Sequence, residues 1–184
     1  MYKPSEKDME QSDEELMLLA AKGDQNAFAT LVSRHQQGIL NFFRRMGAYN
    51  NADDLAQEAF LRLYRYRDRY EPKAKLTTFL YLLARRTWID WRRARERRKK
   101  RHEEFAQVFE LEREPESPSL DEAKEQVARA LETLSDEMRS VVVMSIYQGF
   151  KYREIAEIME IPLGTVKTRM HHALRKMKKV LKNG

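Results

Sequence analysis

The fold of this chain is decided by residues 152–169, which read YREIAEIMEIPLGTVKTR. Apolar residues at helical spacing predict a short helix from Tyr152 to Met159. Pro162 marks a tight break after that helix, and helical spacing resumes at Gly164. Two helices joined by a turn of three or four residues form the helix-turn-helix pattern, whose second helix can enter the major groove of DNA.

The second helix of this motif has two contrasting faces. An apolar stripe at spacings of three and four residues predicts the buried face and consists of Val166, Met170, Leu174, Met177 and Leu181. Residues 163–184 contain seven Lys or Arg and no acid, and such a basic front suits the negative major groove. Short polar side chains there can reach base edges, and the long basic ones can reach phosphates. The basic front holds Thr165, Lys167, Thr168, Arg169, His171, His172 and Arg175.

Two simpler interpretations of this helix remain open from the charge pattern alone. The basic residues form the solvated face of an ordinary bundle if nothing binds there. His171 and His172 are potential metal ligands, but adjacent helical residues point about 100° apart and no third ligand is evident. The sequence therefore predicts no metal site and no cofactor.

Composition narrows the class of protein. The chain has 184 residues, of which 35% are charged, and a formal net charge of +6, a balance that favours a polyanionic partner. It contains no cysteine, which excludes disulfides, thiolate zinc sites, iron–sulfur clusters and a cysteine nucleophile. No apolar run approaches the roughly 18–20 residues of a membrane span, and the N-terminus is too polar for a signal peptide. We therefore expect a cytoplasmic protein without membrane insertion.

Helical periodicity dominates the whole chain, so an all-α fold is predicted. In the first half it predicts helices at 13–22, from Asp24 to about 46, at 52–70 and from Thr77 or Thr78 to about 101. The composition then changes: eight of residues 92–101 are basic, whereas residues 103–125 hold nine acidic and two basic residues. This shift predicts two small helical domains joined by a flexible acidic linker. The expected boundaries are a flexible N-terminus at 1–12, a domain at 13–101, a linker at 102–118 and a domain at 119–184.

Two surfaces of the first domain have open interpretations. In the fourth helix a core face comprises Leu76, Phe79, Leu80, Leu83, Thr87, Trp91 and Ala94, and a second face carries Tyr81, Arg85, Trp88, Arg92, Arg95 and Lys99. Aromatic and Arg side chains at this spacing can bind unpaired bases, or Tyr81 and Trp88 can pack against another helix. On the third helix Asp54, Gln57 and Glu58 form either a docking surface for a basic helix or a solvated face.

In combination, four blocks of this sequence resemble the extracytoplasmic-function (ECF) sigma factors of bacterial RNA polymerase. They occur in the family's order, and the resemblance runs from about Gly23 to Leu181. The four blocks are 23–28 GDQNAF, 52–61 ADDLAQEAFL, 76–84 LTTFLYLLA with Asp90 and Arg92, and 152–156 YREIA with 162–169 PLGTVKTR.

The resemblance implies sigma regions 2 and 4 on a tether, which recruit core polymerase to promoters and open the DNA strands. It places Asp54, Gln57, Glu58 and Leu61 against the clamp helices of the largest polymerase subunit, and it implies a further contact with the polymerase flap. At the single-stranded minus-ten element, the resemblance implies that the loop with Tyr70, Lys73 and Lys75 holds a flipped base and that the face with Leu82 and Arg86 touches the non-template strand. Arg85, Trp88 and Arg93 are expected at the same element, Arg85 and Trp88 at most as flanking backbone contacts. At the double-stranded minus-thirty-five element the resemblance implies Thr165, Lys167, Thr168, Arg169, His171, His172 and Arg175. An anti-sigma protein as regulatory partner is also implied.

The sequence departs from the family pattern at three positions. Arg86 and Phe79 stand where Asn and Trp are common, and Lys151 stands where a Ser or Thr usually caps the next helix.

A free-standing helix-turn-helix regulator is the main alternative function. A metal-dependent nuclease using Asp53, Asp54 and Glu58 is a weaker alternative because the chain has no recognisable catalytic motif. A scaffold protein is also weaker, because it leaves the acid-free helix at 163–184 without a purpose. We therefore expect no enzymatic activity.

Overall fold

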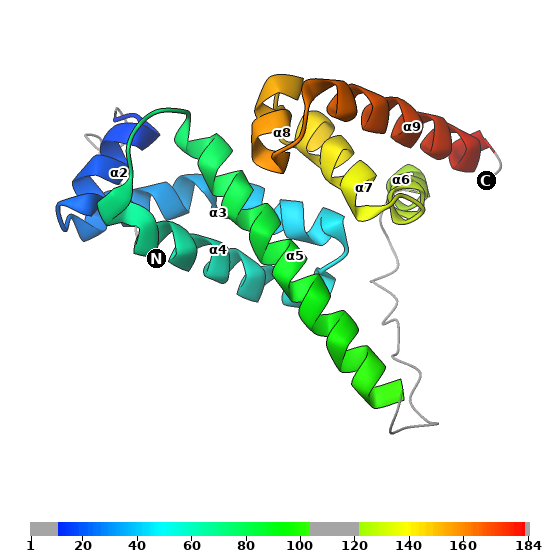
Figure 1. Ribbon diagram of the computed structural model, residues 1–184, viewed down its shortest axis with the longest axis horizontal. Helices are drawn as coiled ribbons and strands as arrows, with labels where there is room; N and C mark the ends of the chain where they lie inside the picture. The colour runs from blue at the N-terminus through cyan, green and yellow to red at the C-terminus, as the bar shows by residue number, and fades with distance from the viewer. Residues whose placement is uncertain (1–10, 104–121, 183–184) are drawn as a thin grey trace.

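The computed structural model describes residues 11–103 and 122–182, and this part of the chain contains helices and turns but no strand, which confirms the all-α fold. The first unit consists of α2 (Asp13–Ala21), α3 (Gln25–Met46), α4 (Ala52–Tyr66) and α5 (Leu76–Glu103), with short 3-10 turns at Tyr49–Asn51 and Arg67–Arg69. The second consists of α6 (Glu122–Glu132), α7 (Asp136–Val142), a π-helical segment η3 (Val143–Tyr147), α8 (Tyr152–Met159) and α9 (Leu163–Lys182) (Figure 1). The linker predicted at 102–118 lies almost wholly outside the described residues.

Local capping signals fix the starts of the first two helices. Ser12 and Glu15 form a reciprocal capping box, in which the Ser12 amide donates to Glu15 Oε2 at 2.8 Å and the Glu15 amide donates to Ser12 Oγ at 3.2 Å. Asp24 Oδ1 accepts from the amides of Asn26 and Ala27 at 2.9 and 3.1 Å. Gly47 ends α3 in the left-handed conformation, with φ of +97°. These helix boundaries agree with the sequence prediction.

The loop between α4 and α5 differs from the prediction at both ends. α4 ends at Tyr66, not at Tyr70. The Tyr66 ring is 41% exposed, and its centroid lies 4.8 Å from that of the Phe79 ring. α5 begins at Leu76 without a local Thr cap. The Leu76 amide instead donates to the Glu14 carboxylate of α2 at 2.8 Å, so the first free amide of α5 is satisfied by a residue 62 positions away.

The buried face of α9 also differs in part from the prediction. Val166, Met170 and Met177 are buried as expected, but Leu174 is 47% and Leu181 is 40% exposed. Ala173 is fully buried in place of Leu174, because α9 packs on α6, α7 and α8 along a line that passes through Ala173. The larger leucine therefore lies one residue outside the contact line and faces solvent.

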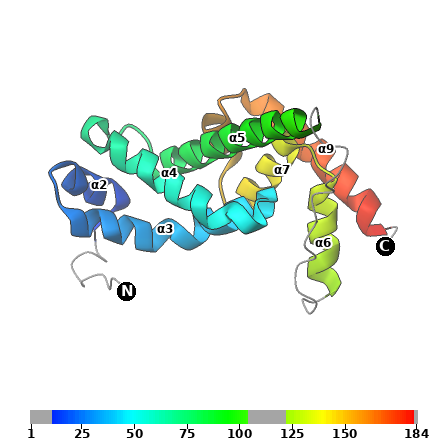
Figure 2. The same ribbon diagram turned by 90° about the horizontal axis from the view of Figure 1, so that it is seen from below.

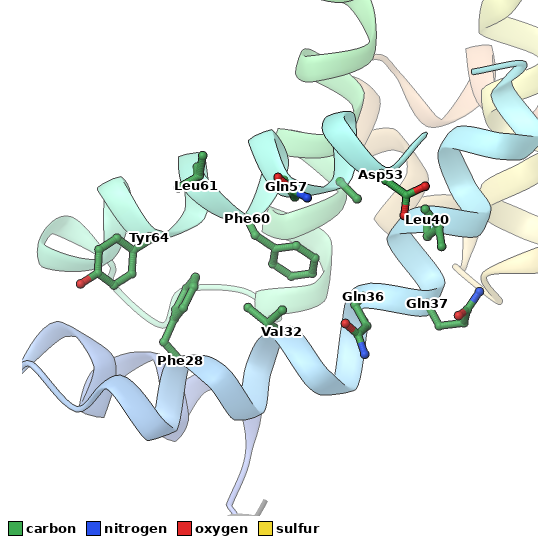
Figure 3. A pocket seen from close by; sticks show the side chains of 11 residues that line it. Phe28, Val32, Gln36, Gln37, Leu40, Asp53, Gln57, Phe60, Leu61 and Tyr64 are labelled. Carbon is green, nitrogen blue, oxygen red and sulfur yellow. The ribbon is translucent and has the colours of Figure 1, made fainter. Parts of the chain in front are cut away.

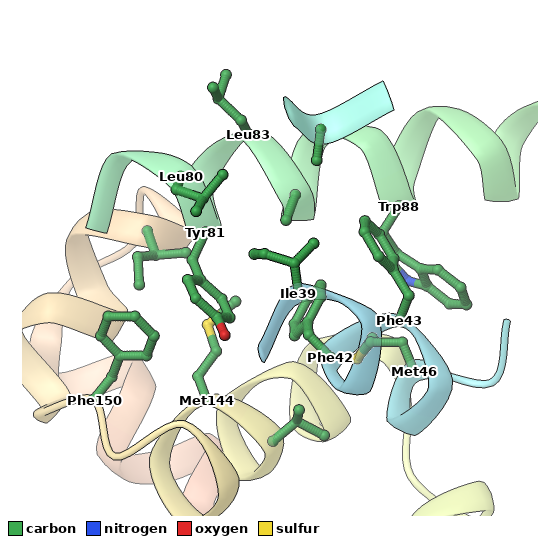
Figure 4. Packing of buried hydrophobic residues seen from close by; sticks show 14 of the residues in the cluster. Ile39, Phe42, Phe43, Met46, Leu80, Tyr81, Leu83, Trp88, Met144 and Phe150 are labelled. Atoms are coloured by element: carbon green, nitrogen blue, oxygen red, sulfur yellow. The ribbon is translucent and has the colours of Figure 1, made fainter. Parts of the chain in front are cut away.

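The two units pack against one another through a continuous apolar cluster. α5 lies against α8, and α3 contacts both α7 and η3 (Figures 1 and 2). Tyr81 of α5 is at the centre: its ring meets Phe42 of the same unit at 5.7 Å and Phe150 of the other unit at 4.8 Å. Figure 4 shows these aromatic rings with Met144 beside them. Tyr81 and Trp88 are therefore both buried, as the packing alternative for the second face of α5 requires.

Candidate functional site

The first candidate surface is the exposed side of α4. Asp54, Gln57 and Leu61 are exposed, with Leu61 47% accessible, and they lie at helical spacing on one side of the helix. Glu58, beside them, accepts a hydrogen bond from Arg62 Nε at 2.8 Å, and Arg62 also donates to Asp90 of α5 at 2.8 Å. The hydrogen bond to Glu58 raises the pKa of the Arg62 guanidinium. The four residues predicted to bind polymerase thus occupy one accessible side of α4.

A groove of about 590 Å³ runs beside this surface, between α3 and α4. Its apolar lining comes from Phe28, Val32, Leu40 and Phe60, and polar residues including Gln36, Gln37, Asp53 and Gln57 lie at its edge (Figure 3). Leu61 and Gln57 belong to both the groove and the exposed side of α4. The combination offers a partner helix an apolar contact next to polar ones.

The loop before α5 holds the next group of predicted residues. Lys73 and Lys75 are exposed, and Lys73 pairs with Glu71. Lys75 Nζ donates to Glu154 Oε1 of α8 at 2.8 Å, and this hydrogen bond raises the pKa of Lys75 and lowers that of Glu154. Tyr70 is buried, and burial raises the pKa of its phenol to about 12. The loop therefore presents lysines to solvent and keeps its tyrosine within the fold.

The face of α5 predicted to meet unpaired bases lies partly under the second unit. Arg86 is about half exposed and donates to Glu160 Oε1 at 2.8 Å. Arg85 is half-buried near Glu160 and Arg169, and burial lowers the pKa of its guanidinium. Leu82 is half-buried and Arg93 is exposed. The Trp88 side chain is only 2% exposed, and the centroid of its ring lies 5.1 Å from that of Trp91. Burial places Trp88, like Tyr70, within the protein interior and away from any ligand surface in this arrangement.

Among the residues that the structure describes, three ion pairs join the two units. Besides Lys75–Glu154 and Arg86–Glu160, Arg92 Nη1 lies 3.1 Å from Asp136 Oδ1 of α7. In each pair the first unit supplies the cation and the second supplies the carboxylate.

The helix-turn-helix is formed by α8 and α9. The start of α8 is held by Glu154, whose Oε2 accepts from the Lys151 amide at 2.8 Å, so a capping contact is present without a Ser or Thr at position 151. Glu160 takes the left-handed conformation, with φ of +55°, and turns the chain towards α9. The turn that was predicted at residues 160–162 is therefore confirmed.

The front of α9 presents most of the predicted base-reading residues to solvent. Two of these predicted residues, Thr165 and Arg169, are half-buried. The other five are exposed and comprise Lys167, Thr168, His171, His172 and Arg175. Thr168 Oγ1 donates to the Gly164 carbonyl at 3.0 Å, which fixes the hydroxyl near the start of the helix. Arg169 Nη1 is buried without a hydrogen-bond partner, towards the side where Arg85 lies. Within residues 11–103 and 122–182, no group of three His, Cys, Asp or Glu side chains could hold a metal ion.

Sequence reasoning missed the polar residues that hold the two units together. Arg139 of α7 is 8% exposed, and its Nη1 donates to the Met46 carbonyl at the end of α3, at 2.9 Å. The Tyr81 hydroxyl donates to Gln148 Oε1 at 2.5 Å, and Gln148 Nε2 donates to the Gly38 carbonyl at 3.3 Å. No local pattern marks Arg139 or Gln148, since each binds a residue more than 60 positions away.

No helix in the described part of the chain is long and apolar enough to cross a membrane.

Known protein families and relatives match this chain over most of its length. The family models "Sigma-70 region 2" and "Sigma-70, region 4" match residues 31–98 and 124–177. The ECF sigma factor SigW of Bacillus subtilis is 31% identical, over 88% of this chain and 92% of its own length. The ECF sigma-E factor of Escherichia coli is also 31% identical, over 88% of this chain and 90% of its own.

Solved structures agree with this fold. CnrH, in its complex with the cytosolic domain of CnrY, has a TM-score of 0.72 at 22% identity, covering 94% of this chain and 99% of CnrH. RpoE of Bartonella quintana, in complex with the anti-sigma factor NepR, has a TM-score of 0.70 at 22% identity, covering 84% of this chain and 96% of RpoE. Two sigma-70 regions in family order, together with full-length relatives at 31% identity, establish that this chain belongs to the ECF RNA polymerase sigma factors, which act in transcription initiation.

Proposed function

We propose that this sigma factor docks on core RNA polymerase through α4, reads two promoter elements with α5 and α9, and holds the opened strand. The observation that supports the proposal is the presence of two separate basic surfaces on one chain, one on α5 and one on α9. A free-standing helix-turn-helix regulator needs only the second. The domain boundaries are proposed at residues 13–101 and 119–184, joined by the acidic linker 102–118.

The polymerase contact is assigned to Asp54, Gln57, Glu58 and Leu61. Accessible acidic and amide groups around an exposed leucine match a basic, amphipathic partner helix, as the clamp helices of the largest subunit would provide. The neighbouring groove between α3 and α4 adds apolar area to the same contact. The second unit is proposed to contact the polymerase flap.

At the minus-ten element, the exposed cations are assigned to the separated strand. Lys73 and Lys75 of the loop and Arg93 of α5 are proposed to neutralise phosphates, Leu82 and Arg86 to touch the non-template strand, and Arg85 to make a flanking backbone contact. Tyr70 and Trp88 support this surface from below, since both side chains are buried. Strand opening follows from tighter binding of the unpaired strand than of the duplex, so it requires no catalytic side chain and no cofactor.

At the minus-thirty-five element, α9 is assigned to the major groove. Lys167, Thr168, His171 and His172 face the base edges from the first half of the helix, with Thr165 at its start. Arg169 and Arg175 are assigned to the phosphates. Arg169 becomes accessible for this role when its buried Nη1 is released from beside Arg85.

The packing of the two units has a direct consequence for this cycle. The ion pairs of Lys75 and Arg86 use cations that the minus-ten strand needs, so the packed form and the DNA-bound form exclude each other at this face. Polymerase therefore has to bind the separated units better than the packed ones. CnrH and RpoE were each solved with a bound partner, and we propose an anti-sigma protein as the regulatory partner here also. The proposed location is the cytoplasm, where polymerase and promoters are found.

Run-off transcription tests this function. Sigma-free core polymerase, the full chain and a library of promoter-length duplexes are combined, and the transcripts and selected sequences are measured. Initiation that requires both proteins and enriches two separated sequence elements is the expected result. Tight binding to a short duplex without core, with no initiation, would contradict the proposal and favour the free-standing regulator.

A further inference from the structure

The last turns of α5 form a dense basic surface, which we call the α5 extension and define as residues 92–100. Arg or Lys occupies seven of its nine positions, and every side chain from Arg95 to Lys100 is exposed. In Figure 1 these turns project beyond the other helices of the first unit. Like charges so close together on a helix repel one another, and such a surface gains most from a polyanionic partner.

Part of this charge is already engaged within the fold. Arg92 pairs with Asp136 and, at 3.3 Å, with Glu96, and the Arg95 guanidinium lies 5.4 Å from the centre of the Trp91 ring. Arg97 and Arg98 lie beyond these contacts and are exposed. Because successive residues of a helix point about 100° apart, the two arginines cover different sides of the extension.

The distribution of side chains indicates what kind of partner fits. The cations surround the helix, and the extension has only Ala94 as an apolar residue, so it offers no apolar stripe to a protein partner. A nucleic acid needs no such stripe, because its charge is regularly spaced along a line and its affinity comes from counterion release. A DNA duplex is therefore the favoured class of partner.

The order of the chain indicates which DNA the extension meets. It follows the α5 face assigned to the minus-ten element and precedes the unit that carries α9. Arg97 lies eleven residues beyond Arg86 on one helix, which is about 16 Å at 1.5 Å per residue, or roughly five base pairs of duplex. Because the extension lies in the chain between the two surfaces assigned to the promoter elements, the duplex at that distance is the spacer between those elements in the proposed complex.

We propose that the α5 extension binds the phosphate backbone of the duplex spacer, through Arg97 and Arg98, without reading its sequence. This inference rests on the proposed function, since the spacer exists only if the chain reads both elements. The acidic segment that follows, residues 103–125, is the competing occupant, because its nine acids could neutralise the same arginines.

The test uses holoenzyme and a promoter selected in the run-off assay. Arg97→Gln/Arg98→Gln is compared with Lys22→Gln/Arg44→Gln, a control that removes the same charge from exposed positions on the first unit. Each protein is measured on the natural duplex and on one whose spacer phosphates, over the five base pairs next to the minus-ten element, are replaced by neutral methylphosphonates. Helix content is compared by circular dichroism.

We expect the Arg97/Arg98 variant to bind the natural promoter about tenfold more weakly at 0.1 M salt and to lower the salt slope of log K by about two units. The neutral spacer should weaken the wild type and the control but leave this variant unchanged, and scrambling the spacer sequence should affect none of them. Equal weakening of wild type and variant by the neutral spacer, or an unchanged slope in the variant, would overturn the inference and favour the acidic segment. Failure of the proposed function would give a different result from failure of this inference, because wild-type holoenzyme would then not initiate transcription at all.

Discussion

The guanidinium of Arg139, on α7, donates a hydrogen bond to the carbonyl of Met46, the last residue of α3, across the interface between the two units. A cation at the C-terminus of a helix satisfies a free carbonyl and lies at the negative end of the helix dipole. Burial lowers the pKa of Arg139, and its Nε has no hydrogen-bond partner in the described structure. The contact is therefore specific in geometry but costly in desolvation.

Gly47 makes this contact possible and allows a matched test. A Cβ at Gly47 would lie 2.9 Å from Arg139 Nη1, whereas a Cβ at Gly23, which has the same φ of +97°, would meet nothing within 4 Å. Gly23→Ala should cost about 1–2 kcal/mol of folding free energy from backbone strain alone. Gly47→Ala carries the same strain and also displaces Arg139, so its urea midpoint should fall further.

The same pair of variants reports on the interface. Because the chain has no cysteine, Lys22→Cys/Lys178→Cys introduces two unique sites for fluorescent labels on the two units. Energy transfer between them should drop in the Gly47→Ala background and stay near wild type in the Gly23→Ala background. Equal transfer in both would show that Arg139 does not hold the units together.

The ion pair between Arg86 and Glu160 predicts a gain of function. Glu160→Gln removes the charge that pairs with Arg86, and it should raise the affinity of the free protein for a single-stranded minus-ten oligonucleotide. Both side chains are about half exposed, so the effect is small, at most about fivefold. Fluorescence anisotropy measures it, with Glu157→Gln in α8 as the control. A weaker affinity in Glu160→Gln than in the control would contradict this role.

A phosphate contact at Arg175 predicts a defined salt effect. Arg175→Ala should weaken holoenzyme binding to the promoter and lower the salt slope of log K by about one unit, equally for all promoter sequences. Lys167→Ala, placed at the base edges, should instead relax sequence preference at one position. An unchanged slope in Arg175→Ala would remove its assignment to a phosphate.

Asp13 predicts how stability depends on pH. Burial opposes ionisation of this carboxyl, but hydrogen bonds from His35 at 2.6 Å and Arg34 at 2.8 Å outweigh burial and hold the pKa of Asp13 below its ordinary 3.8. A depressed folded-state pKa stabilises the fold above pH 3.8, and this contribution is lost as the pH falls through the folded-state value.

Asp13→Asn should therefore lower the free energy of unfolding by about 1–2 kcal/mol at pH 7, and this cost should shrink as the pH falls below 3.8. Denaturant unfolding of both proteins at a series of pH values measures the difference. A constant difference across the whole pH range would show that the ionised carboxylate is not what stabilises α2 against α3.

Local signals made most of the helices predictable from the sequence. The capping box at Ser12, the cap at Asp24 and the break at Pro162 act within a few residues, so they are visible without the fold. The sequence left two functions open for Tyr81 and Trp88, because the spacing that buries a ring between helices equals the spacing that exposes it to bases. Only the position of the second unit, with Phe150 against Tyr81, distinguishes them.

Contacts between distant residues account for what the sequence could not predict. The cap of α5 comes from Glu14, and the exposure of Leu174 depends on where α6 and α7 lie against α9. The assignments of polymerase and DNA residues came from the family resemblance, and they remain predictions for the experiments above. Burial separates the residues assigned to the minus-ten element into two groups. Tyr70 and Trp88 are buried, whereas the other assigned residues are half-buried or exposed.

The cross-unit ion pairs have a consequence for the response of the free protein to ionic strength. Lowering the salt strengthens the attraction of Lys75 and Arg86 for DNA, but it equally strengthens their attraction for Glu154 and Glu160. Raising the salt loosens the units and weakens DNA binding at once. Because these two effects oppose one another, the affinity of the free protein for a minus-ten strand should depend less steeply on salt than that of holoenzyme, in which the units are proposed to be apart.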